Sequence, residues 1–462
     1  MTKPAPRVLL ISQDPVGEHM AGMGIRYTEL ARALAAHGRV TLAAVGEAGS
    51  VGGNRNAAGE ASAGGVADAA DAADAADAVQ SVGFRPHAPG ALAPHVAAAD
   101  LVVCPPQWHV VSRWLRHSRA RVVHDLYDPE ALETLELFAG RGALVRRTMV
   151  ALTLDRLDDA LSTGHHFVCA SEKQRDLWLG TIVARRLVDP ARYDDDPALR
   201  DLVDVVPFGL PAEPPRRDPT QPSIRERFPA LGDDDEIVLW NGGLWRWLDA
   251  PTAIRAVAAL HARRPGLRLV FMGAGTGAAG RGAGEEARRV AGELGVLDSV
   301  VLFNDAWVPY AQRANWLLDA TCAISTHRDH LETRFAFRTR LLDCFWAGLP
   351  VVCTEGDDLS VRVEREGLGA TCAAGSPASA AAALERVLER GRAAHLPALA
   401  AAAAELTWPR VVAPLVRWLQ DPGPPPRRLV RSVPLHRTPA HQARVVAYAV
   451  GRRALDRAQR RA

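Results

Sequence analysis

The residues best suited to chemistry lie between His327 and Thr354, where a charged segment separates two short apolar stretches. The charged segment brings Arg338 and Arg340 together, and Glu332 precedes them by a few residues. Guanidinium groups bind phosphate oxygens through paired hydrogen bonds, and carboxylates accept hydrogen bonds from sugar hydroxyls. We therefore expect a site for an anionic ligand. The competing interpretation is a surface loop whose charges pair with one another.

The sequence around this segment predicts a strand, a loop, a helix and a second strand in succession. An apolar run ends at Ser325, and a helix is expected to begin near Thr339 and to stop at Gly348. Another strand is expected from Val351 to Cys353. In doubly wound sheets ligands bind at the carboxyl ends of strands, where this loop lies. The start of the helix adds free backbone N–H groups and a positive dipole for a phosphate.

Length and composition are those of an ordinary globular protein with more than one domain. The chain has 462 residues, of which 48% are hydrophobic and 23% are charged. It contains no apolar run of about 18 residues and no signal-peptide pattern, so we expect a cytoplasmic location without a membrane-spanning helix. The six cysteines lie far apart, mostly in apolar stretches. We interpret them as reduced core residues rather than disulfides or zinc ligands.

The first half of the chain alternates between apolar strands and helices, which predicts a parallel sheet. The first strand leads into a loop with Gly22 and Gly24, whose missing side chains permit close approach of a ligand. Arg26 lies just beyond them. A later strand, 121–129, is expected to project His124 from its end, where chemistry usually sits. A histidine satisfied by the backbone is the alternative.

Several segments are predicted to connect or interrupt the domains. Residues 47–80 are rich in Gly, Ala, Ser and Asp and cannot support a packed core, so we interpret them as an insertion. One helical stretch is predicted from Glu130 to about Leu161. The Pro-rich residues 211–222 mark a domain boundary. The aspartates at 194–196 and 233–235 do not follow strands, so we expect no metal site there.

The second half repeats the alternation and ends in a basic tail. A strand over 236–247 runs into a glycine turn, and another is predicted over 299–310. An amphipathic helix is predicted over 407–419. The tail contains a basic helical stretch at 441–461. Two interpretations of that stretch stay open: peripheral contact with an anionic membrane, or a helix docked on the protein.

Together these features resemble the GT-B glycosyltransferases, and more closely the retaining glycosyltransferase family 4, over about residues 7–420. The motifs that carry the resemblance are MAGMGIRYTELARALAAHG (20–38), ASEKQRDLWLG (170–180), VVPFG (205–209), NGGLW (241–245) and LLDCFWAGLPVV (341–352). The resemblance implies an α/β protein with two Rossmann-like doubly wound domains facing a cleft. The implied parts are an acceptor-binding domain (1–206), a nucleotide-sugar-binding domain (207–406), a helix crossing back to the first domain (407–420) and a Pro/Arg-rich tail (421–462).

The resemblance also implies a reaction. A hexosyltransferase-like enzyme would move a sugar from a nucleoside diphosphate sugar to an unidentified small-molecule, glycan or lipid-linked acceptor, with retention and without a metal or other cofactor. The family's ribose-binding Glu corresponds to Asp343, and Glu332 is the acid nearest to the family's other Glu, whose position is Phe335. The family's diphosphate-binding Arg and Lys are missing from NGGLWRWLD. Arg246 is the nearest cation there.

The remaining site residues are assigned by the same resemblance. Arg338, Arg340, the amides near Thr339 and Arg246 would stabilise the leaving diphosphate. Gly242 and Gly243 are assigned to donor binding. Residues near the base would be Trp307 and Val308, and those on the acceptor side would be Gly22, Gly24, Arg26 and His124. The protein is expected to lie in the cytoplasm or at the inner face of the membrane, and not to bind nucleic acid. The alternative function is a catalytically inactive, nucleotide-binding partner subunit of the same fold.

Overall fold

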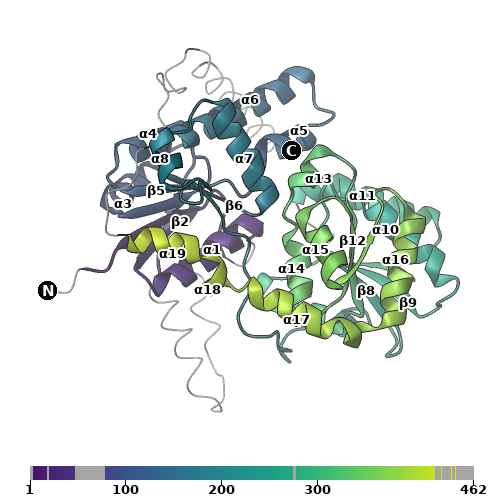
Figure 1. Ribbon diagram of the computed structural model, residues 1–462. Helices are drawn as coiled ribbons and strands as arrows, with labels where there is room; N and C mark the ends of the chain where they lie inside the picture. The colour runs from purple at the N-terminus through teal and green to yellow at the C-terminus, as the bar shows by residue number, and fades with distance from the viewer. Residues whose placement is uncertain are drawn as a thin grey trace. The chain divides into compact units, whose positions relative to one another are not determined.

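The structure is a computed structural model that describes residues 4–17, 20–46, 79–273 and 277–421, and Arg428, Pro439 and Ala443 beyond them. The stretch 47–78 and nearly all of the tail, including the basic stretch 441–461, lie outside the described residues. The chain divides into two compact units (Figure 1). The first unit is built from the residues up to Gly17, Met23–Val206 and the residues from Val412 onward. The second is built from Pro207–Val411 and the short segment that ends at Gly22.

The first unit contains a parallel sheet of seven strands in the order β3-β2-β1-β4-β5-β6-β7. Its strands are β1 (Arg7–Ile11), β2 (Arg39–Val45), β3 (Val79–Phe84), β4 (Leu101–Cys104), β5 (Arg121–Asp125), β6 (His166–Cys169) and β7 (Val203–Val205). Its helices are α1 (Gly22–Ala35), α3 (Ala93–Ala98), α4 (His109–His117), α5 (Glu130–Leu137), α6 (Ala143–Thr163), α7 (Glu172–Ala184), α8 (Pro190–Asp195) and α19 (Ala413–Gln420), with a short 3₁₀ turn at Pro89–Leu92.

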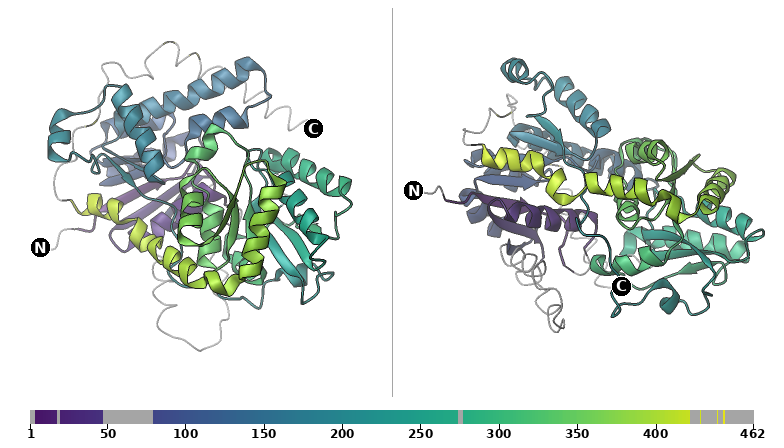
Figure 2. Two further views of the ribbon diagram at one scale, coloured as in Figure 1. Left: turned by 45° about the vertical axis from the view of Figure 1, so that its right-hand side comes forward. Right: turned by 60° about the horizontal axis from the view of Figure 1, so that its bottom comes forward.

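The second unit contains a parallel sheet of six strands in the order β10-β9-β8-β11-β12-β13. Its strands are β8 (Glu236–Gly243), β9 (Leu267–Gly273), β10 (Val301–Phe303), β11 (Cys322–Ser325), β12 (Val351–Thr354) and β13 (Gly369–Cys372). Its helices are α9 (Ile224–Arg227), α10 (Ala250–His261), α11 (Gly277–Glu293), α12 (Arg313–Asp319), α13 (Leu331–Phe335), α14 (Thr339–Trp346), α15 (Asp358–Glu366), α16 (Pro377–Arg390), α17 (Leu396–Glu405) and α18 (Trp408–Val411). Helices flank both sheets, as Figures 1 and 2 show.

Local sequence signals set many of these boundaries. Ser171 caps α7 by accepting a hydrogen bond from the Gln174 N–H, and Asp249 caps α10 in the same way. The predicted start of α14 at Thr339 is confirmed. Gly348 follows that helix with φ +60°, a left-handed conformation that favours glycine and ends the helix.

The structure corrects four predictions about elements. The helix predicted over 130–161 is two helices, because the chain turns at Gly140, where φ is +78°, and restarts as α6. Residues 79 and 80 belong to strand β3 rather than to the insertion predicted over 47–80. The strand predicted over 299–310 is only three residues long. The helix predicted over 407–419 is interrupted at Val412, because Pro414 supplies no N–H and starts a new helix.

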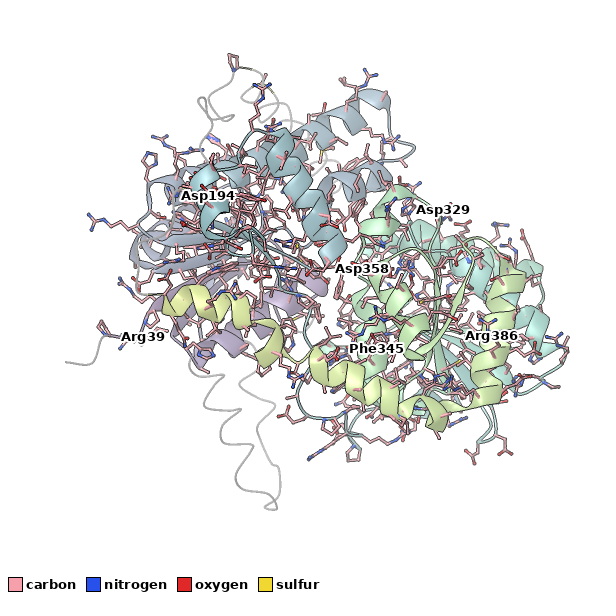
Figure 3. The ribbon with its side chains drawn as sticks, in the orientation of Figure 1. Arg39, Asp194, Asp329, Phe345, Asp358 and Arg386 are labelled. Atoms are coloured by element: carbon pink, nitrogen blue, oxygen red, sulfur yellow. The ribbon has the colours of Figure 1, made fainter. Side chains whose placement is uncertain are left out.

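Each sheet has its own buried apolar core. In the second unit Trp240, Phe271 and Phe345 are almost fully buried, and Trp240 packs against Phe271 with ring centroids 5.4 Å apart. Figure 3 shows Phe345 within the second unit, among the side chains of α14 and its neighbours. All six cysteines are buried free thiols. Within the described ranges, no helix is both long enough and apolar enough to cross a bilayer.

Candidate functional site

The charged segment of the sequence lies at the carboxyl ends of β11 and β12 in the second unit. It contains a short helix, α13, that the sequence did not predict, and it leads into α14. The His330 side chain caps α13 by accepting a hydrogen bond from the Thr333 N–H. Figure 3 labels Asp329 on the loop just before this helix. Strand β8 lies beside β11 in the sheet, so its glycine turn ends at the same edge.

Arg340 connects α14 to that glycine turn. Its Nη2 donates a hydrogen bond to the Gly243 carbonyl at 3.0 Å, and the Asn241 amide donates to the Arg340 carbonyl at 2.7 Å. Its Nη1 is buried without a hydrogen-bond partner, and no ion pair joins Arg340 to a carboxylate among the described residues. Burial and the neighbouring Arg338 lower the pKa of Arg340 to about 10. A partly buried cation without a carboxylate partner is stabilised when an anion binds beside it.

Gly242 leaves open space beside this guanidinium. Its φ of +113° is a conformation that other residues rarely adopt. A Cβ added there would lie 3.7 Å from Arg340 Nη2. The register between β8 and β9 shifts between Trp240 and Gly243, which lifts the turn out of the regular ladder. The two glycines predicted from the sequence therefore border the unbalanced charge.

Arg338 has a different environment from Arg340. It is buried and forms an ion pair with the fully buried Asp357, and its Nη1 donates to the Thr354 carbonyl at 2.8 Å. Asp357 also caps α15 by accepting from the Ser360 N–H. Arg338 thus fixes the loop after β12 to the start of α14. Its charge still raises the local positive potential, but the pairing makes it primarily a residue that positions the site.

His327 is a candidate that the sequence analysis did not single out. It is buried, its backbone N–H donates to Thr354 Oγ1 at 2.9 Å, and its Nδ1 has no hydrogen-bond partner. Burial, followed by the charges of Arg338 and Arg340, lowers its pKa well below the ordinary value. The ring is therefore neutral at physiological pH. Its position directly after a strand end, beside an arginine-rich helix start, was the available signal.

Each of the two predicted acidic residues lies beside a basic side chain in the structure. Glu332 is buried on α13, and its carboxylate lies 3.6 Å from His330 Nδ1. Asp343 accepts a hydrogen bond from Arg313 Nε at 2.9 Å, and 21% of its side chain is exposed. Glu332 lies in the first turn of α13. Asp343 lies one turn into α14 and keeps an accessible edge.

The other donor-side predictions lie on neighbouring loops of the second unit. Arg246 is exposed in the turn after β8. Trp307 and Val308 follow β10, and 40% of the surface of Trp307 is exposed. Thr339 is the first residue of α14.

Two residues predicted for the first unit are buried, which contradicts the roles expected for them. His124 lies inside β5 rather than beyond its end, has no exposed surface, and its Nε2 is 2.8 Å from Thr163 Oγ1. Burial lowers its pKa to about 4. Arg26 is also fully buried, and its Nε donates to Asp125 Oδ2 at 2.8 Å. Both therefore stabilise the core, because neither reaches a surface where an acceptor would bind.

The glycines predicted for the acceptor side, Gly22 and Gly24, lie in a helix rather than in a loop. Helix α1 begins at Gly22, which is exposed, whereas Gly24 is buried in its first turn. Asp128, just beyond β5, is the half-buried acid of this edge, and burial followed by the charge of Glu130 raises its pKa to about 8. Among the described residues, no group of three or more His, Cys, Asp and Glu side chains has a metal-binding arrangement.

Comparison with known proteins now adds to this geometry. Residues 235–390, which include the strands of the second sheet and α14, match the family described as "Glycosyl transferases group 1". No curated protein matches the sequence at a significant level.

Solved structures of low sequence identity share the architecture. HepE of Anabaena, solved with UDP and glucose, is 14% identical, and the alignment covers 90% of this chain and 99% of HepE with a TM-score of 0.61. The trehalose-6-phosphate synthase OtsA is 14% identical over 90% of this chain and 100% of its own, with a TM-score of 0.61. WaaG, a glycosyltransferase of lipopolysaccharide biosynthesis, is 15% identical over 89% and 99%, with a TM-score of 0.53.

These structural likenesses establish the GT-B fold predicted from the sequence, with two α/β domains. The family match covers the unit that contains the unbalanced Arg340. The chain therefore has the GT-B fold, and residues 235–390 of its second unit match the glycosyl transferases group 1.

Proposed function

We propose that this protein transfers a sugar from a nucleoside diphosphate sugar, with retention of configuration and without a metal, in the manner of glycosyltransferase family 4. The observation that carries the proposal is Arg340, whose partly buried guanidinium has no carboxylate partner among the described residues and lies against the glycine turn. HepE was solved with UDP-glucose, which supports a uridine nucleotide as the first donor to test.

The proposed role of Arg340 is to stabilise the leaving diphosphate. Negative charge accumulates on the diphosphate as the glycosidic bond breaks, and a cation held in place beforehand needs no reorganisation to stabilise it. The free N–H groups at the start of α14 contribute in the same direction. Because these groups supply the positive charge themselves, the proposed mechanism assigns no step to a metal ion.

The acids have separate proposed roles. Asp343 accepts a hydrogen bond from a ribose hydroxyl, and Arg313 holds the carboxylate in place for that contact. Glu332 contacts the sugar of the donor near the start of α14. Neutral His327 offers its unpartnered Nδ1 to the same ligand. Trp307 and Val308 are proposed to contact the base.

The test begins with binding. Thermal unfolding would be recorded with UDP-, GDP-, ADP- and dTDP-sugars for the natural chain, Arg340→Met and Asp343→Ala. We expect one nucleotide class to raise the melting temperature. We expect that shift to disappear in Arg340→Met but to persist in Arg334→Met, whose arginine is exposed on the same segment.

Turnover separates the enzyme from its alternative, a catalytically inactive partner subunit that binds nucleotide. Removing one transition-state donor typically lowers kcat by about 10²–10³, so Arg340→Met should lose activity to that degree. Release of sugar from the preferred donor supports an enzyme. Activity that persists with a chelator supports metal independence, and a product with the anomeric configuration of the donor supports retention. Binding without any donor turnover favours the inactive subunit, and no binding of any nucleotide contradicts both.

A further inference from the structure

The α5–α6 hairpin of the first unit, residues 130–154, has an apolar and basic tip. Helix α5 has no buried residue. In α6 the first buried residue is Leu152, so the helix extends from Ala143 to Ala151, about 13 Å, without burying a side chain. Figure 1 shows the two helices as neighbours at the edge of the first unit. The apolar residues of this segment are therefore left on the surface.

The hairpin is nevertheless an organised structure. Arg146 Nε donates to the Leu135 carbonyl at 3.1 Å, and the hydroxyls of Thr134 and Thr153 lie 3.2 Å apart. Both contacts connect one helix to the other. The tip is thus held in place by its own hydrogen bonds, and its exposed side chains keep a fixed arrangement.

The exposed side chains form one surface, which we call the hairpin tip. Its apolar members are unusually exposed: 80% for Leu144, 49% for Val145 and 40% for Leu137. Arg141 and Arg147 are exposed beside them. Leu144 and Arg147 share one face of α6 because they are three residues apart. That face continues to Leu154, which is 44% exposed.

The end of the hairpin is basic, although α5 before it is acidic. Residues 137–154 contain Arg141, Arg146 and Arg147 and no acidic residue, whereas Glu130, Glu133 and Glu136 lie on α5. Exposed arginines bind an anionic group, and the exposed leucine and valine side chains beside them bury their surface against an apolar partner. A bilayer with anionic headgroups offers both within a few ångströms.

We propose that the hairpin tip docks this protein on an anionic lipid surface, with Leu144 and Val145 entering the headgroup region and Arg141 and Arg147 binding lipid phosphates. The proposal is independent of the sugar-transfer proposal and of the tail. It places the membrane contact on the first unit, within the described residues.

Vesicle co-sedimentation of the full chain tests the proposal. The vesicles are phosphatidylcholine alone and phosphatidylcholine with phosphatidylglycerol. We expect binding to the anionic vesicles only. Leu144→Glu/Val145→Glu and Arg141→Glu/Arg147→Glu should each weaken it by about tenfold or more. Val183→Glu is the matched control, because Val183 is 60% exposed on α7 of the same unit, and it should bind unchanged.

A chain truncated after Asp421 separates the hairpin from the basic stretch 441–461. Retained binding in the truncated chain supports the hairpin tip. Binding that is lost on truncation but unchanged in the hairpin variants overturns the proposal in favour of the tail. Absence of vesicle binding also overturns the proposal. So does a dimer, detected by light scattering, that Leu144→Glu/Val145→Glu abolishes, because a second copy of the chain would then cover the hairpin tip. The circular dichroism of each variant would be measured to establish that it folds.

Discussion

At the scale of single residues, the arginines of this protein differ in whether a carboxylate neutralises the guanidinium charge. Arg26 and Arg338 are buried against the carboxylates of Asp125 and Asp357. The guanidinium of Arg340 donates to the Gly243 carbonyl and lies over the Trp240 ring, with no carboxylate beside it among the described residues. Breaking the ion pair of a buried arginine lowers the stability of the fold. An arginine without a carboxylate partner is instead stabilised by a bound anion. Arginine composition alone therefore does not identify the functional residue.

The buried pair of the first unit gives a prediction for stability. Asp125→Ala leaves the guanidinium of Arg26 buried and unpaired, so the free energy of unfolding should fall by about 3–5 kcal/mol. Urea denaturation would measure the change. Glu385→Ala is the control: it breaks an exposed pair with Arg263 and should change stability by less than about 1 kcal/mol. Equal losses in the two variants would contradict this account of Arg26.

His124 gives a prediction for the pH dependence of stability. Its pKa is lowered from 6.5 to about 4 by burial, so between these values the folded protein binds fewer protons than the unfolded chain. The free energy of unfolding should therefore fall as the pH is lowered from about 6.5 to about 4, by about 3 kcal/mol from this residue. His124→Gln, which does not titrate, should show a shallower fall. An unchanged slope would contradict burial of a neutral ring.

Sequence reasoning selected the charged segment and the glycine turn but could not rank their residues. The charged segment and the glycine turn were identified from residue types alone, and the structure brings Arg340 against Gly243 as a contact between them. The role of Arg338 depends on Asp357, nearly twenty residues away, and such pairing has no local signature. His124 was expected at a strand end, but β5 lies between β4 and β6 in the sheet and all five of its residues are buried.

At the scale of elements, the start of α1 offers a test of the predicted acceptor side. A Cβ added to Gly22 would meet no atom within 4 Å, so Gly22→Ala should keep or slightly raise stability, by up to about 1 kcal/mol. We expect kcat/KM for the acceptor to fall by about tenfold while donor binding stays unchanged, because the methyl group would occupy ligand space.

A matched control exists in α7. A Cβ at Gly180 also meets nothing within 4 Å, so Gly180→Ala should leave both stability and turnover nearly unchanged. If Gly22→Ala has normal acceptor kinetics, the predicted role of this glycine in acceptor binding is wrong.

The helices also show which sequence signals are dependable. Caps such as Ser171 and Asp249 are dependable signals because the side chain bonds to the next turn of its own helix. The break between α5 and α6 was missed because the apolar pattern runs through it and only the glycines mark it. Strand β3 was missed because it follows a low-complexity stretch.

At the scale of the whole molecule, the first unit is completed by residues from the far end of the chain. Trp418 on α19 stacks on His166 with ring centroids 4.3 Å apart, and Arg417 pairs with Asp204 at 3.0 Å. Leu415 is fully buried. The doubly wound fold was predictable because strand and helix periods are local, whereas the membership of this last helix depends on contacts across more than two hundred residues.

This arrangement predicts a selective effect of truncation. A chain ending at Val411 lacks α19, so hydrogen exchange should speed up in peptides of β6 and β7, which include His166 and Asp204. Peptides of β8, β11 and β12 should exchange as before. A chain ending at Asp421 keeps α19 and is the control. Faster exchange throughout both units of the shorter chain would contradict a local role for α19.

The split first unit has a consequence for biosynthesis. A ribosome delivers β1 before the second unit and α19 after it, so the first unit stays incomplete until the whole second unit has emerged. The uninterrupted segment Pro207–Val411 contains the whole second sheet and needs no later element for it. Domains usually fold in the order in which they are made. In this protein the nascent second unit can acquire its sheet while the first still awaits the helix that covers it.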